Sequence, residues 1–151
     1  MAWIIGGGVL PACIIASWLI FQRPFRKLIE AIHADHARDL FRLRREWLEA
    51  RFLGALAKSD PQAARIWNEG HWQNEIHWAR DRKSRCLLAL VAVTFNPSPF
   101  DLDLSHCATA IFEFRKGRWQ AEGKRIDETR PADALLRHQR FEPVLPPRGR
   151  G

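Results

Sequence analysis

The spacing of hydrophobic and polar residues changes along the chain. In the first stretch the residues are apolar almost throughout, without a regular alternation of polar and apolar positions. Residues 1–21 (MAWIIGGGVLPACIIASWLIF) contain no charged side chain, and an apolar run of about 20 residues is typical of a helix that crosses a membrane. Trp3 and Trp18, near its two ends, suit the interfacial regions of a bilayer. Basic side chains follow at once in residues 22–27 (QRPFRK), so the positive-inside rule places the rest of the chain in the cytoplasm.

A cleaved signal peptide, a lipoprotein signal at Cys13 and a buried core helix are the alternatives to a membrane span. No basic region precedes the apolar run, as a signal peptide would require, and the run continues past Cys13. We therefore predict a single-pass protein of the cell membrane. Its cytoplasmic domain would occupy residues 22–141, and residues 142–151 (EPVLPPRGRG), rich in proline, glycine and arginine, would be a disordered tail.

Between residues 25 and 58, apolar positions recur at three- and four-residue steps, which predicts one long amphipathic helix. Asp60 and Pro61 then predict the cap and first position of a short second helix that ends near Trp67. The expected core-facing stripe of the long helix is Phe25, Ile29, Ile32, His36, Leu40, Leu43, Trp47 and Ala50, flanked by Leu28, Phe41, Leu48, Phe52, Leu53 and Leu56.

After residue 70 the period shortens to two, which predicts strands. The almost continuous hydrophobicity of residues 85–95 indicates a central strand that is covered on both faces. A short helix over residues 129–141 would begin at Pro131 and pack Leu135, Leu136 and Phe141 on the sheet. We predict four antiparallel strands in meander order: residues 75–80, 85–95, 106–115 and 118–125.

The order of these elements predicts an α+β fold in which the long helix lies across one face of the sheet. A cystatin-like arrangement is the nearest analogy. Residues 110–119 (AIFEFRKGRW), 123–127 (GKRID) and 131–135 (PADAL) together resemble the C-terminal part of an uncharacterised bacterial family of small single-pass membrane-anchored proteins. Those proteins also carry an N-terminal span and a helix similar to residues 45–52 (REWLEARF). The resemblance implies this topology and no particular activity.

The formal charge of +7 falls entirely on residues 22–151. An anionic cytoplasmic leaflet attracts such a domain, and because acidic residues are interleaved with the basic ones, a nucleic-acid groove is disfavoured. The three cysteines form no CxxC pair, which indicates free thiols in a reducing compartment.

Two groups of residues have side chains of the types found in metal sites or in ligand pockets. Glu30, His33 and His36 share helical spacing and are metal-ligand types, although a metal site would need a second such motif on a facing helix. A second region combines aromatic and titratable residues, as ligand pockets do. For both groups, solvated or core side chains are the simpler interpretation. The residues of the second region are Trp72, Glu75, His77, Asp101, Asp103 and His106.

Because no nucleophile with a placed base accompanies either group, we expect neither an enzyme nor a cofactor. The sequence favours a membrane-anchored accessory or scaffold protein that acts through protein contacts of its cytoplasmic domain. The long helix is compatible with an unidentified partner protein and with a homodimer through residues 25–58. The alternative hypothesis is a membrane-bound domain that binds a small ligand, or acts on one, in a pocket formed by residues 71–106.

Overall fold

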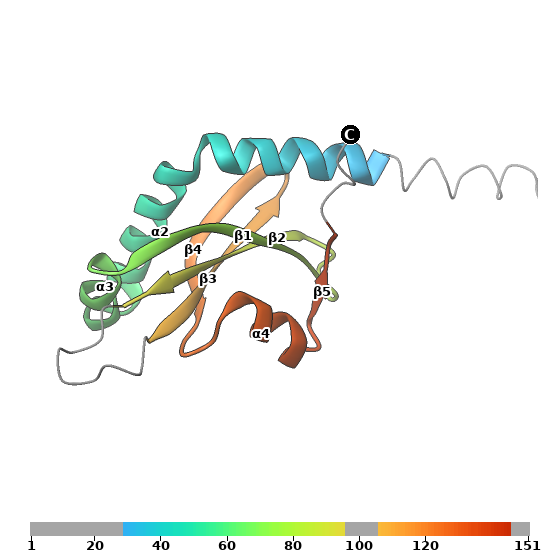
Figure 1. The fold of residues 1–151 in the computed structure, drawn as a ribbon. Coiled ribbons are helices and arrows are strands. Elements are labelled where there is room, and N and C mark those ends of the chain that lie inside the picture. The colour runs from blue at the N-terminus through green and yellow to red at the C-terminus, as the bar shows by residue number, and fades with distance from the viewer. Residues whose placement is uncertain (1–28, 96–105, 146–151) are drawn as a thin grey trace, which may run out of the picture. The chain divides into compact units, whose positions relative to one another are not determined.

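Four helical segments and a five-stranded antiparallel sheet make up residues 29–95 and 106–145, the part of the chain that the computed structural model describes (Figure 1). The α+β class is confirmed. The chain divides into two compact units, Met1–His36 and Ala37–Gly151, and residues 29–36 of the first are helical. None of the described helices has the length and apolar character needed to cross a membrane. The predicted span, residues 1–21, lies outside the described residues and stays a prediction.

The sheet has the strand order β4-β3-β2-β1-β5, in which the first four strands form the predicted meander. As expected for a central strand, β2 is buried along most of its length. Lys116 and Gly117, with φ of 50° and 74°, form the two-residue turn between β3 and β4, because such turns need positive φ at both positions. The four strands are β1 (His71–Asp81), β2 (Leu87–Thr94), β3 (Cys107–Arg115) and β4 (Arg118–Ile126).

A fifth strand, β5 (Phe141–Pro143), extends the sheet beyond β1 by pairing with residues 79–81. The prediction of four strands is therefore incomplete, because it leaves Glu142 and Pro143 in the tail. Three residues are too few to show a period of two, and proline argues against a strand except at a sheet edge, which is where it lies here.

The prediction of one unbroken helix over residues 25–58 is wrong at Arg44, where a turn separates the helical residues 29–43 from α2 (Arg45–Ser59). Arg44 has φ −108° and ψ 12°. Its N–H still donates to the Leu40 carbonyl at 3.1 Å, and its carbonyl accepts from the Leu48 N–H at 2.9 Å. The chain therefore bends without leaving these groups unpaired (Figure 1). Phe41 before the bend and Phe52 after it both contact the ring of Phe112 in the sheet.

The helix face that packs on the sheet is the flank of the predicted stripe and not the stripe itself. Leu43 is 81% exposed and Trp47 is 53% exposed, although the sequence places both in the core. Each buried residue lies one position away from a predicted stripe residue or further along the same flank, which corresponds to a rotation of about 100° around the helix axis. The buried apolar residues, none more than 1% exposed, are Ala37, Phe41, Leu48, Phe52 and Leu56.

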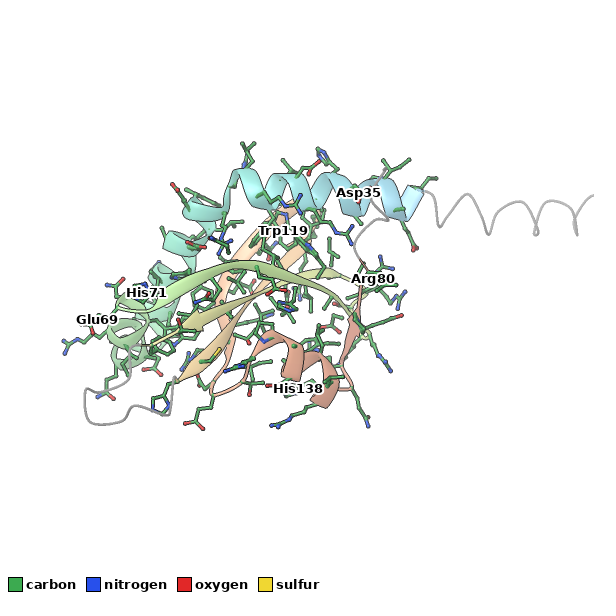
Figure 2. All side chains as sticks on the ribbon, in the orientation of Figure 1. Asp35, Glu69, His71, Arg80, Trp119 and His138 are labelled. Atoms are coloured by element: carbon green, nitrogen blue, oxygen red, sulfur yellow. The ribbon has the colours of Figure 1, made fainter. Side chains whose placement is uncertain are left out.

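Aromatic rings fill the space between the helical residues and the sheet. Phe41 meets Trp78, Phe112 and Trp119 in edge-on geometry, with centroid distances of 5.7, 5.2 and 4.9 Å. Such pairs contribute about 0.5–1.5 kcal/mol each beyond the burial of their surface. The indole N–H of Trp119, a side chain labelled in Figure 2, donates to the Ala37 carbonyl at 2.7 Å, so this buried donor is satisfied.

The short second helix is confirmed as α3 (Pro61–Asn68), with the predicted cap. The Asp60 carboxylate accepts a hydrogen bond from the Ala63 N–H at 3.1 Å, which satisfies one of the free N–H groups at the helix start. On the inner face of α3, Trp67 lies 5.2 Å from the Phe52 ring, centroid to centroid. The helix thereby extends the aromatic core beyond α2.

The opposite face of the sheet is covered by α4 (Pro131–Arg137) (Figure 1). Leu135 of α4 packs against a cluster that includes Leu90 of β2 and Phe141 of β5. The predicted packing of Leu136 is wrong, because that side chain is 86% exposed. Neighbouring positions on a helix point about 100° apart, so only one of the two leucines faces the sheet.

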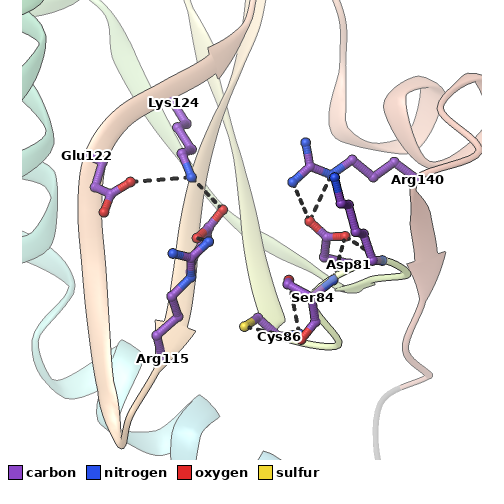
Figure 3. Close-up of polar contacts among 9 residues, drawn as sticks. Asp81, Ser84, Cys86, Arg115, Glu122, Lys124 and Arg140 are labelled. Atoms are coloured by element: carbon purple, nitrogen blue, oxygen red, sulfur yellow. Dashed lines mark hydrogen bonds and ion pairs between the residues drawn. The ribbon is translucent and has the colours of Figure 1, made fainter.

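One buried carboxylate ties the end of β1 to the chain that leads into β5. Asp81 is 1% exposed, and its Oδ2 accepts from Arg140 Nε at 2.8 Å, while its Oδ1 accepts from the Lys83 N–H at 2.8 Å (Figure 3). The hydrogen bond from Arg140 lowers the pKa of the Asp81 carboxyl below its ordinary value of 3.8, against the opposing effect of burial.

Replacing Gly123 is expected to destabilise the fold. Gly123 has φ +74°, and a Cβ there would lie 3.1 Å from the backbone N of Leu56 in α2, so Gly123→Ala should cost about 1–3 kcal/mol of unfolding free energy. Gly54→Ala is the matched control: no atom lies within 4 Å of its Cβ position, and it should stabilise the helix by about 0.5–1 kcal/mol. Urea denaturation of the full-length protein measures both. Equal effects of the two changes would contradict the close approach of β4 to α2.

Asp81→Asn should destabilise the protein by about 1–3 kcal/mol at neutral pH, because a charge-assisted hydrogen bond is lost in a buried place. Since the folded pKa of Asp81 lies below 3.8, its contribution is full above that pH and disappears as the pH falls through the folded value. The stability gap between wild type and variant should therefore close in acid. Asp127→Asn, at a side chain that is 62% exposed, should cost less than about 1 kcal/mol. A gap that does not change with pH would refute this role.

Candidate partner-binding groove

A groove of about 580 Å³ lies between α2 and the β3–β4 hairpin. On the helical side its lining residues, Leu40, Arg44, Trp47 and Arg51, follow one another at steps of four, three and four positions. Residues at these steps share one face of a helix. The other wall is formed by residues 117–122, which run from the hairpin turn into β4.

The floor of the groove is apolar and its rim is basic. Leu48 and Trp119, both lining residues, are 0% and 8% exposed, and belong to the core underneath. Arg44, Arg51 and Arg118 are exposed and stand around this floor. The tight turn at Gly117 places Arg118 at the start of β4, directly across from α2. The groove therefore combines a closed apolar floor and the exposed ring of Trp47 with three guanidinium groups.

Among the described tryptophans, Trp47 alone is in the exposed class. Its ring nevertheless has a contact. The guanidinium carbon of Arg51 lies over its ring, 5.1 Å from the centroid. This is cation–π geometry, which contributes about 0.5–1 kcal/mol at an exposed position. The contact orients both side chains, so the aromatic and the charged parts of the groove are held together before any partner binds.

The positive charge of the groove is not neutralised from within. In the described parts of the chain, Arg44, Arg51 and Arg118 form no ion pair. The one acidic residue of the lining, Glu122, instead lies 3.3 Å from the ammonium of Lys124 (Figure 3).

Lys124 itself is held by a second carboxylate. Its Nζ donates to Glu113 Oε1 at 2.8 Å, and Glu113 is 5% exposed. The hydrogen bond to Glu113 raises the pKa of Lys124, so the ammonium stays charged beside Glu122. Glu122 is therefore compensated by Lys124, and the arginines on the rim keep their charge for a ligand.

Arg45, next to the groove in sequence, has a different role. Its Nε donates to Glu49 at 2.7 Å, its Nη1 donates to the Asn74 carbonyl at 2.9 Å, and its Nη2 donates to the Gln73 carbonyl. These two carbonyls belong to a bulge of β1, where the pairing with β2 shifts register. Arg45 thus supports the fold, and not every arginine of α2 is available to a partner.

The residues predicted for a ligand pocket do not gather at one place. Trp72 lies in the aromatic core, 5.6 Å from Phe52 by ring centroid. His77 pairs across the strands with Leu90, which belongs to the cluster under α4. Because paired residues share a face of the sheet, Trp72 and His77 lie on opposite faces.

The other predicted pocket residues give no shared cavity either. Glu75 is exposed in the β1 bulge, where its Oε1 lies 3.6 Å from His77 Nε2. His106 is exposed immediately before β3. Asp101 and Asp103 lie outside the described residues, so a pocket that includes them stays a prediction.

The predicted metal ligands all lie on one helical segment of the described chain. Glu30, His33 and His36 are exposed on the helical residues 29–36. Throughout residues 29–95 and 106–145, no group of three or more His, Cys, Asp or Glu side chains is arranged to hold a metal ion. The metal hypothesis stays a prediction that would require ligands from elsewhere. Cys86 and Cys107 are free, partly buried thiols.

Comparison with protein-family models, with curated proteins and with solved structures finds no match for this chain. The family resemblance and the cystatin-like analogy therefore stay predictions. Only the residues that line the groove indicate what it binds.

The groove was not among the sites predicted from the sequence, although the sequence contains a signal for it. The helix carries apolar residues on two adjoining faces, and one sheet face can bury only one of them. Leu40, Leu43 and Trp47 belong to the face that remains outside. The helix has more apolar positions than one sheet face can bury, and some of them are interleaved with Arg44 and Arg51. This pattern indicates that one apolar stripe stays exposed on the surface.

Proposed function

We propose that this chain is a non-enzymatic accessory protein, held at the cell membrane by residues 1–21 with its domain in the cytoplasm, and that it acts through protein contacts at the groove. The observation that carries the proposal is the second apolar stripe of the helical segment. Leu43 and Trp47 are exposed on it, beside an open groove with a buried floor. Exposed apolar surface of this kind, rimmed by polar residues, marks interaction sites.

The chemistry of the groove supports binding more than catalysis. Among the described residues that line it there is no His, Ser, Thr, Cys or Lys side chain, and their single carboxylate, Glu122, is paired with Lys124. Arginine stays protonated at any physiological pH and so does not act as a general acid or base. Arginine and tryptophan are, however, the residues that contribute most to protein interfaces.

The contact expected at Trp47 has the size of a hot spot in a protein interface. A tryptophan side chain buries up to about 250 Å², and Trp47 has 53% of its surface still exposed. Covering that remainder would contribute about 3 kcal/mol at about 25 cal/mol per Å². The arginines would add specificity and faster association.

A different protein is favoured over a second copy of this chain. A two-fold contact across the groove would bring Arg44, Arg51 and Arg118 close to their own copies. Like charges at an interface cost free energy. A homodimer through other parts of residues 25–58 stays a prediction.

Photo-cross-linking tests this proposal at the level of one side chain. Benzoylphenylalanine in place of Trp47, in the full-length protein within its native membrane, should give a discrete protein cross-link, because the groove would lie in the interface. The matched control is the same group in place of Leu136, which is 86% exposed on α4 and should give none.

Mass spectrometry of the product separates the outcomes. A stoichiometric protein adduct from position 47 alone supports the proposal, and a self-adduct would assign the contact to a homodimer. The absence of any protein adduct at position 47, or equal adducts from both positions, would contradict it.

A further inference from the structure

We infer that the occupant of the groove is an acidic, extended segment of another protein, a conclusion that rests on the proposed function and gives the partner its chemistry. Three features of the groove support this inference. Its three arginines favour a negatively charged ligand, and the separation of Arg44 and Arg51 along the helix favours an elongated one. The exposed ring of Trp47 and the partly exposed Leu40 favour at least one apolar side chain.

Charge complementarity indicates the sign of the ligand's charge. Arg44, Arg51 and Arg118 stand on the rim without a carboxylate partner in the described residues, while Glu122 is already paired with Lys124. Guanidinium groups bind carboxylates in bidentate geometry, which orients the ligand as well as attracting it. An acidic segment satisfies all three without displacing an internal ion pair.

Spacing gives the shape of the ligand. Arg44 and Arg51 are seven residues apart, which is two helical turns and about 10 Å along the axis. Trp47 lies between them on the same face, and the Arg51 guanidinium stacks on its ring at 5.1 Å from the centroid. The two arginines are therefore held apart and do not converge on one small anion. In a polyproline-type segment, residues three apart lie on the same side at about 9 Å, which matches this separation.

The apolar part of the groove gives the remaining element of the recognition pattern. Between the two arginines the segment would present an apolar side chain to the exposed Trp47 ring and to Leu40. The recognition pattern is thus a repeat of acidic and apolar residues with a period of three. Gln120, on the hairpin wall, is available to hydrogen-bond the backbone of such a segment.

A lipid surface fits this groove less well than a protein segment. A bilayer presents a broad plane, whereas the lining residues of α2 and of residues 117–122 enclose a hollow of about 580 Å³. A chain segment can enter the hollow and a plane cannot. Anionic lipid is therefore treated as a competing outcome of the experiment.

The test uses full-length protein in phosphatidylcholine nanodiscs and a fluorescein-labelled peptide of Glu-Pro-Leu repeats, with binding followed by fluorescence anisotropy. The peptide should bind, and more weakly as salt is added. Arg44→Gln, Arg51→Gln and Arg118→Gln should each weaken binding about two- to fivefold, as exposed ion pairs do. Trp47→Ala should weaken it tenfold or more. Arg65→Gln, at an exposed arginine of α3 outside the groove, is the control and should bind like wild type.

Two further peptides test the pattern itself. Gln-Pro-Leu repeats remove the charge, and Glu-Pro-Ser repeats remove the apolar side chain, so both should bind at least fivefold more weakly than Glu-Pro-Leu repeats. All substituted residues are exposed, and circular dichroism verifies that each variant is folded. Equal binding of the charged and uncharged peptides, or arginine variants that bind like wild type, would overturn the inference.

The remaining outcomes separate the inference from the proposed function. If position 47 cross-links to a protein, but the acidic peptide does not bind and the arginine variants keep that cross-link, the accessory role stands and the acidic segment is wrong. If position 47 instead gives phosphatidylserine adducts in mixed-lipid nanodiscs and the peptide does not bind, the groove is a lipid site and the inference fails. If position 47 gives no cross-link of any kind, that absence would count against the proposed function itself.

Discussion

The packing of Phe41 and Phe52 on β3 determines how the helical segment is rotated about its axis. Both side chains are 0% exposed, and both meet the ring of Phe112, at centroid distances of 5.2 and 5.6 Å. Two large rings fixed to one strand residue leave the helix little freedom to turn, because core packing tolerates few voids. Leu43 and Trp47 are consequently directed outward. The groove and its chemistry depend on this rotation.

Local signals were enough to predict much of the fold. Gly117 marked the hairpin and Asp60 the start of α3, because a positive φ and a helix cap depend only on neighbouring residues. The bend at Arg44 and the strand β5 depend instead on distant parts of the chain. The bend lies between Phe41 and Phe52, which both pack on Phe112 of β3. Arg140, just before β5, contacts Asp81 at the end of β1. No local sequence pattern indicates either set of contacts.

The site was less predictable than the fold, for a related reason. Phe41 and Leu40 lie on adjoining apolar faces with the same helical spacing, and periodicity alone does not say which face meets the sheet. The ring contacts of Phe41 decide it. Arg118 joins Arg44 in one groove only because the hairpin folds back beside α2. A surplus of apolar helix positions over what one sheet face can bury is a sequence signal worth seeking in other small α+β domains.

The groove depends on an exposed Trp47, and fluorine NMR of the full-length protein labelled with 5-fluorotryptophan measures this exposure. Trp47→Phe identifies the resonance of Trp47, and Trp67, which is 3% exposed, serves as the buried reference. A soluble gadolinium chelate should broaden the Trp47 signal strongly and leave that of Trp67 sharp. Equal protection of the two signals would place Trp47 in the core and contradict the account.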